Sequence, residues 1–73
     1  MPFKWTPARM DQLERAALKG SRVSIVRRGN EYVVVARRVS VRGKRETLIG
    51  ILPMTGDEIE FDLAEVEDFQ VVG

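Results

Sequence analysis

Cysteine and histidine are both absent from this chain of 73 residues. Without cysteine there are no disulfide bonds, no thiolate metal ligands and no cysteine nucleophile. Without histidine, a serine nucleophile lacks its usual general base, and zinc lacks its usual nitrogen ligand. We therefore expect no catalytic activity and no bound cofactor or metal.

Long apolar runs and glycine-rich loops are also missing. No apolar stretch is long enough to cross a bilayer, and the first ten residues lack the apolar segment of a signal peptide. Small secreted domains usually depend on disulfide bonds, so we expect a single cytoplasmic domain with no membrane partner. The glycines occur singly near predicted turns and bends, which argues against a phosphate-binding loop.

Basic and acidic residues are strongly segregated along the chain, although the net charge is only +1. Residues 1–45 contain all twelve Lys and Arg and three acids, a net charge of +9. Residues 46–73 contain eight acids and no base, a net charge of −8. This pattern indicates either a charged binding surface or pairing of the two halves within the fold.

Residues 7–19 have the pattern of an amphipathic helix. Thr6 is placed to cap free backbone N–H groups, a proline occupies the first helical position, and Gly20 suits the left-handed residue that ends a helix. Trp5 and Met10 have the spacing of a hydrophobic staple across the helix start. A helix of about 13 residues is marginal by itself, so it must pack against the rest of the domain.

The remainder of the chain predicts β-structure. Apolar residues alternate in a first strand near Val23 and Ile25, and Gly29-Asn30 is a tight turn signal before a second strand over residues 31–42. Three shorter strands follow, over residues 47–52, around the alternating apolar positions 59, 61 and 63, and over residues 67–72. An interior glycine at position 50 predicts a sharp bend or a close approach of another backbone.

These elements predict an α+β fold that is mainly β. One domain contains helix 7–19, followed by a strongly bent, five-stranded antiparallel β-barrel over residues 22–72. In the second strand, alternation assigns Val33, Val35, Val39 and Val41 to one face. The predicted core consists of Trp5, Leu13, Val23, Ile25, Val33, Val35, Ile49, Ile51, Ile59, Phe61, Leu63, Val66, Phe69 and Val71.

The spacing of several apolar residues resembles that of Sm-like proteins, which are small SH3-type barrels. Val23-x-Ile25-x-x-x-Gly29-x-x-Tyr32 is similar to the first half of the Sm motif, whereas Leu48-x-Gly50-x-Leu52 and Phe61-x-Leu63-x-x-Val66 are similar to strand endings of Sm-like and WYL-type barrels. The Asp-and-Asn pair with which Sm proteins hold a base has no counterpart between Arg38 and Arg42. The second Sm motif and the Trp-Tyr-Leu tripeptide of WYL domains are also absent. The resemblance therefore implies the fold and no binding residue.

Residues 22–46 contain eight of the twelve basic residues and form a predicted basic hairpin. Arginine guanidinium groups bind phosphates through paired hydrogen bonds, and the aromatic rings of Tyr32 and Trp5 could stack on bases. The sequence thus favours weak nucleic-acid binding through seven residues of this segment: Arg27, Arg28, Arg37, Arg38, Arg42, Lys44 and Arg45.

Three alternatives to nucleic-acid binding are consistent with these charges. The arginines could form a solvated face that discourages aggregation, or they could pair with the acidic strands within the molecule. They could also belong to a protein-interaction or self-assembly module in which the basic face of one subunit meets the acidic face of another. Glu58, Glu60 and Asp62 lie about 7 Å apart along one predicted strand face, too far apart to hold one ion, and are expected to face solvent.

Overall fold

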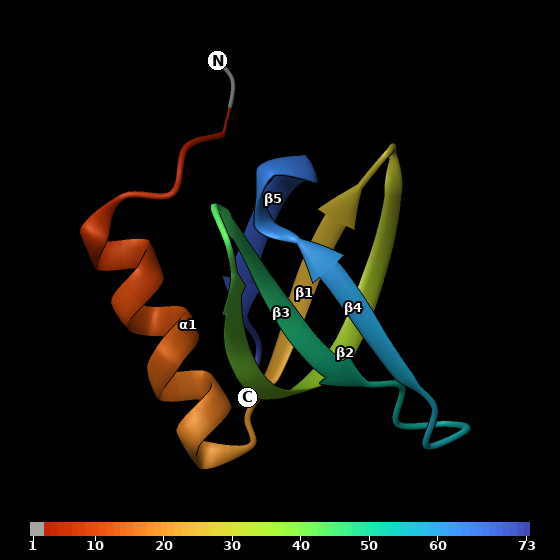
Figure 1. Ribbon diagram of the computed structural model, residues 1–73. Helices are drawn as coiled ribbons and strands as arrows, with labels where there is room; N and C mark the ends of the chain where they lie inside the picture. Colours follow the sequence, from red (N-terminus) through yellow and green to blue (C-terminus); the bar gives the residue numbers. More distant parts are fainter. Residues whose placement is uncertain (1–2) are drawn as a thin grey trace.

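The computed structural model describes residues 3–73 and contains one N-terminal helix and an antiparallel sheet (Figure 1). In chain order the elements are α1 (Pro7–Lys19), β1 (Arg22–Arg27), β2 (Asn30–Arg42), β3 (Arg45–Ile51), β4 (Glu58–Asp62), the 3₁₀ helix η1 (Leu63–Glu65) and β5 (Val66–Val71). The five strands form one sheet in the order β4-β3-β2-β1-β5. The predicted α+β, mainly β fold with its N-terminal helix is thus confirmed. No helix within residues 3–73 is long and apolar enough to cross a membrane.

The sheet is strongly bent, and α1 lies along one side of it (Figure 1). Backbone pairing joins β4 to β3 and β5 to β1, and no pairing between β4 and β5 closes the ladder within residues 3–73. The two outer strands therefore keep open edges. They are connected through η1, which brings the end of β4 to the start of β5.

Helix α1 begins and ends at the predicted residues because its two caps are local. The hydroxyl of Thr6 accepts a hydrogen bond from the Arg9 backbone N–H at 3.2 Å, and Gly20 adopts the left-handed conformation with φ of 66°. Leu13 and Ala16 are buried against the sheet, whereas Leu18 is 89% exposed. The helix thus uses one narrow apolar stripe for packing and leaves an apolar side chain at its end in solvent.

Trp5 attaches the segment before α1 to η1 and β5. Its indole Nε1–H donates a hydrogen bond to the Leu63 carbonyl oxygen at 2.7 Å. The indole ring lies 5.2 Å from the Phe69 ring and 5.0 Å from the Phe3 ring, measured between centroids. Trp5 is half-buried and packs against the core, so a structural role for it agrees with the sequence prediction.

The turn between β1 and β2 is displaced by one residue from its predicted position. Its central residues are Arg28 and Gly29, with φ of 53° and 75°, and Arg27 pairs with Asn30. Positive φ at both central residues is the pattern of the type I′ turn, whose twist matches that of a hairpin. The assignment of Gly29-Asn30 as the central pair is therefore wrong, although the positive φ of Gly29 is as expected.

The face assignment in β2 is wrong in its first half. Val34 and Ala36 are fully buried, whereas Val33 is 43% exposed and Val35 is half-buried. The reason is the hairpin register, which places Val34 opposite Val23 of the core face.

A bulge in β2 explains why strict alternation fails along this strand. Ala36 pairs with Gly50, but the next register position pairs Arg38 with Ile49, so that Arg37 is an extra residue. Before the bulge the even-numbered residues of β2 face the core, and after it the odd-numbered residues do. Val39 therefore packs against the core, whereas Val33 is exposed.

The observed core overlaps most of the predicted one. Val71 is 45% exposed, so its assignment to the core is wrong, and Ile51 and Ile59 are only half-buried. Leu48 is fully buried but absent from the predicted core, which took Ile49 and Ile51 from this strand; Ile49 is buried too, so β3 is covered on both faces at this point. The buried apolar residues are Leu13, Ala16, Val23, Ile25, Val34, Ala36, Leu48, Ile49, Phe61, Leu63, Val66 and Phe69.

Candidate interaction surfaces

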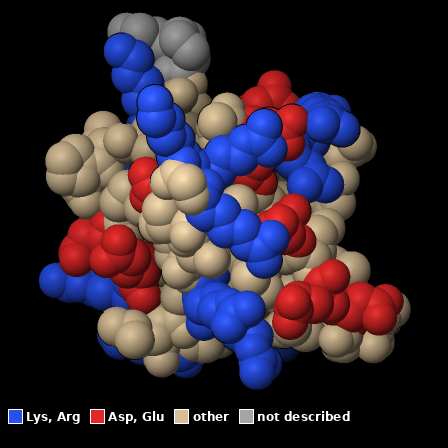
Figure 2. Space-filling view, viewed as in Figure 1, with Lys and Arg blue, Asp and Glu red and all other residues tan. Residues whose placement is uncertain are grey.

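The seven basic residues predicted to bind nucleic acid do not lie on one continuous basic face. Arg27 packs against aromatic rings, Arg28 lies in the β1–β2 turn, Arg37 and Arg38 lie at the bulge in β2, and the others lie around the β2–β3 turn. Figure 2 shows basic side chains running across one side of the molecule, with acidic side chains next to them. The structure therefore brings Arg28, Arg42 and Arg45 together around one hollow and places Arg37 and Arg38 at another groove.

Arg27 joins the β1–β2 hairpin to β4. Its guanidinium carbon lies 5.1 Å from the Tyr32 ring centroid and 4.9 Å from the Phe61 ring centroid. Its Nη1 donates a hydrogen bond of 3.3 Å to the Glu60 carbonyl oxygen, a main-chain group of the edge strand. Tyr32 in turn packs edge-to-face on Phe61 at 5.4 Å between centroids. Arg27 and Tyr32 are thus engaged in the packing of the protein.

A hollow of about 480 Å³ contains as many acids as arginines. The Arg28 Nη2 lies 2.8 Å from the Glu65 Oε2. This hydrogen bond and, after it, the negative charge of Glu65 raise the pKa of the Arg28 guanidinium, which stays charged. The charged residues that line the hollow are Arg28, Arg42, Arg45, Glu60, Asp62 and Glu65. Among residues 3–73, the ion pair found in this hollow is the one between Arg28 and Glu65.

Arg37 and Arg38 are exposed at the edge of a second groove, between α1 and the distal half of β2. This groove has a volume of about 400 Å³. Its apolar residues are Ala17, Leu18, Val39 and Val41, and its charged residues are Arg37, Arg38, Glu14 and Glu46. The groove is thus lined by two bases and two acids.

The acids of β4 lie along its outer side, as the sequence predicts from their alternation. Glu58, Glu60 and Asp62 pair in the sheet with Ile51, Ile49 and Thr47. Within residues 3–73 no group of three Asp or Glu side chains is arranged to hold a metal ion. These carboxylates therefore form an acidic border on one open edge of the sheet.

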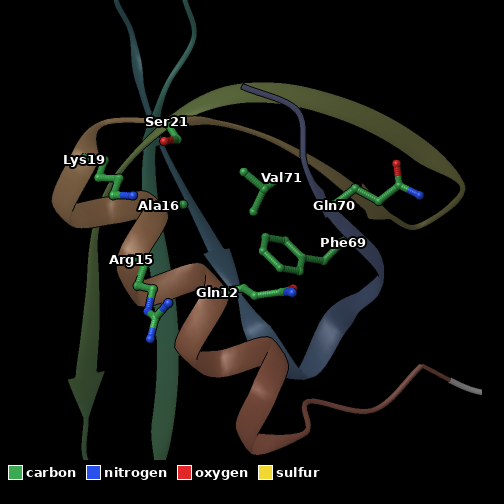
Figure 3. Close-up of a pocket in the computed structure, with 8 residues that line it drawn as sticks. All are labelled: Gln12, Arg15, Ala16, Lys19, Ser21, Phe69, Gln70 and Val71. Atoms are coloured by element: carbon green, nitrogen blue, oxygen red, sulfur yellow. The ribbon is translucent and has the colours of Figure 1, made fainter.

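A third groove, between α1 and the edge strand β5, was missed by the sequence analysis. Its volume is about 500 Å³, and Figure 3 shows Gln12, Phe69 and Val71 pointing into the space between the two elements, whereas Gln70 points away from it. The lining residues are Gln12, Arg15, Ala16, Lys19, Ser21, Phe69, Gln70 and Val71. Positions 12, 15, 16 and 19 have the spacing of one helix face, but no local signal shows that β5 is an edge strand beside this face.

Neither the protein-family models nor the curated proteins searched give a match to this chain. Function is therefore inferred from the surfaces described above. These are a charge-balanced hollow, an apolar groove with mixed charges, and a groove that includes an open strand edge. The last of these offers main-chain hydrogen-bonding groups in addition to side chains, which sets it apart chemically.

Proposed function

We propose that the protein is a small binding module whose partner is another protein. The observation that carries this proposal is the open edge of β5, which faces α1 across a groove of about 500 Å³. Extended peptides bind such edges because their main chain continues the hydrogen-bonding pattern of the sheet. Cysteine and histidine are missing from the sequence, and a binding role agrees with that composition.

The same proposal includes the Sm-like, SH3-type barrel as the fold. The strand order β4-β3-β2-β1-β5 and the short η1 connection would fit a strongly bent sheet whose two ends approach each other. The hydrogen bond from Arg27 to the Glu60 carbonyl and the ion pair between Arg28 and Glu65 both join the β1–β2 hairpin to the other end of the sheet. These side-chain contacts would thus connect the two ends of the bent sheet, which backbone hydrogen bonds leave unpaired.

Weak nucleic-acid binding is the second candidate function. The specific observation in its favour is the β2–β3 hairpin, where Arg42, Lys44 and Arg45 are all exposed within four residues. Its signature would be an affinity that falls steeply as the salt concentration rises, because bound phosphates release counterions. The acids beside Arg42 and Arg45 in the same hollow oppose the approach of a polyanion, so we rank this function below peptide binding.

Self-assembly is the alternative within the protein-binding class. Glu58, Glu60 and Asp62 belong to one open edge of the sheet, and Glu67 and Asp68 belong to the other. Pairing of these two edges between copies would bring carboxylates close to carboxylates, which disfavours the contact. We therefore propose a partner other than a second copy.

Selection from a displayed library of random peptides on the immobilised protein tests the proposed function. We expect independent clones to converge on one consensus, and free folded protein to compete with their binding. The matched control is Leu13→Asp, which places a charge at a fully buried position and unfolds the groove. Failure of the clones to converge, or equal capture by the Leu13→Asp variant, would contradict a peptide-binding function.

A further inference from the structure

We propose that the groove between α1 and β5 binds an extended, acidic peptide that adds to β5 as a sixth strand. This inference rests on the proposed function and specifies its site and its ligand chemistry. The peptide would carry a carboxylate at every second position, facing α1, and neutral residues between. Three features of the groove support it: the free main chain of β5, the basic side chains of α1, and the spacing between them.

The edge of β5 has main-chain groups available for a partner strand. The Val72 N–H donates to the Arg22 carbonyl at 2.9 Å, so antiparallel alternation turns the main-chain groups of Val71 and Phe69 away from β1. The Phe69 N–H donates instead to the carboxylate of its neighbour Asp68, at 2.9 Å. The Val71 N–H and the carbonyls of Val71 and Phe69 are then directed outward from the open edge of β5, in the pattern that an added strand requires.

The α1 side of the groove is basic. Arg15 and Lys19 line it one helical turn apart, and both point from α1 in the close-up (Figure 3). Within residues 3–73, Lys19 makes no ion pair, and Arg15 pairs with Asp11 at 3.0 Å in a mostly exposed contact. An exposed pair of this kind exchanges at little cost in free energy. Both cations are therefore accessible to a carboxylate ligand.

The spacing of these cations matches an extended peptide. Four helical residues span about 6 Å along the axis of α1, and alternate residues of a strand are about 7 Å apart. Carboxylates at positions i and i+2 of the peptide could thus face Arg15 and Lys19 together. The residues between them would lie on the opposite face, on the side of Asp68 and Gln70, where a further carboxylate would be repelled.

The acidic strand β4 of a second copy is the competing occupant, because it is also extended and acidic at alternate positions. One main-chain group of this strand is already bound, because the Glu60 carbonyl accepts a hydrogen bond from Arg27. A second copy would have to displace Arg27, which also stacks on Tyr32 and Phe61. Among the described residues, the outer main chain of β5 is contacted in this way only by the Asp68 carboxylate, which accepts a hydrogen bond from the Phe69 N–H. A separate peptide is therefore the occupant that the contacts favour.

The test is a titration of the intact, ¹⁵N-labelled protein with a blocked peptide of alternating threonine and glutamate, followed by amide chemical shifts. We expect saturable shifts in residues 12–19 and 68–72, and none with the matched threonine–lysine peptide. Arg15→Ala with Lys19→Ala should weaken binding at least about tenfold. Arg37→Ala with Arg38→Ala removes the same charge elsewhere and should leave the affinity unchanged.

N-methylation of the peptide separates strand addition from simple charge attraction. Only alternate N–H groups of an added strand face β5, so methylation of one set of residues should abolish binding and methylation of the other set should be tolerated. The proposal would be overturned if methylation of the two sets had equal effects, or if no saturable shift were seen. Shifts centred on residues 42–46, or a loss of affinity in the Arg37/Arg38 variant, would overturn it as well. A library consensus that lacks acids, or that maps to another surface, would overturn this inference while leaving the proposed function intact.

Discussion

Replacement of Trp5 by alanine should lower the free energy of unfolding by about 3 kcal/mol, the effect expected for loss of a large packed aromatic side chain. The substitution removes the 2.7 Å hydrogen bond to the Leu63 carbonyl and the ring contact with Phe69. In a domain of this size, a loss of that magnitude lowers the thermal midpoint by more than about 10 °C. Urea unfolding and a thermal melt of the intact chain measure it.

The matched variant is Trp5→Phe, which keeps an aromatic ring and removes the N–H donor. Its cost should be smaller, about 1 kcal/mol, because the Leu63 carbonyl loses one hydrogen bond while most of the packing stays. A Trp5→Ala protein that melts with wild type would show that the N-terminal segment contributes nothing to stability. Trp5 would then be available as an aromatic binding surface.

Replacement of Gly50 by alanine should destabilise the protein by about 2 kcal/mol through overpacking. A Cβ at position 50 would lie 2.7 Å from the Val34 Cγ2 and 3.0 Å from its Cβ. Val34 is fully buried and cannot move away from the added methyl group. The expected result is a lower urea midpoint with an unchanged denaturant slope.

A double-mutant cycle with Val34→Ala identifies the cause. If the two side chains clash, Gly50→Ala should cost clearly less in the Val34→Ala protein than in wild type, because the methyl group then occupies vacated space. Additive costs in the cycle would exclude the clash. Backbone conformation at position 50 would then have to explain the requirement for glycine.

The helix and the element order could be predicted because their signals are local. Thr6, the proline after it and Gly20 define the limits of α1 through hydrogen bonds and backbone angles that involve few neighbouring residues. At Gly50 the expected close approach is made mainly by the Val34 side chain, 2.7 Å from the position of an added Cβ, and the nearest main-chain atom is the Val35 carbonyl oxygen at 3.4 Å.

The faces of β2 could not be predicted from alternation because the strand contains a bulge. Five apolar residues in succession, 32–36, give no preference for either face. The hairpin turn does show which face is buried. With either Arg28-Gly29 or Gly29-Asn30 as the central pair of the turn, the buried Ile25 pairs with an even-numbered residue of β2. Pairing across the turn therefore assigns Val34 to the core face, and its exposed neighbour Val33 to the outer face.

The environment of each arginine depends on contacts between distant parts of the chain. Arg27 stacks on Phe61 and Arg28 pairs with Glu65, partners more than thirty residues away. Likewise, the groove between α1 and β5 exists because β5 pairs with β1 and thus becomes an edge beside the helix. Composition identified the charge segregation, but only the strand order shows which charges meet.

We propose that the partner of this domain is a protein and not a nucleic acid, because the acids beside Arg28, Arg42 and Arg45 oppose the approach of a polyanion. The most direct measurement is a titration of labelled single-stranded and duplex oligonucleotides at about 20 mM salt, where phosphate binding is strongest. The account predicts no saturable binding of either ligand. Saturable binding that weakens steeply as the salt concentration rises would contradict it. In that case Arg42→Ala with Arg45→Ala should reduce the salt dependence of binding, and Arg15→Ala with Lys19→Ala should not.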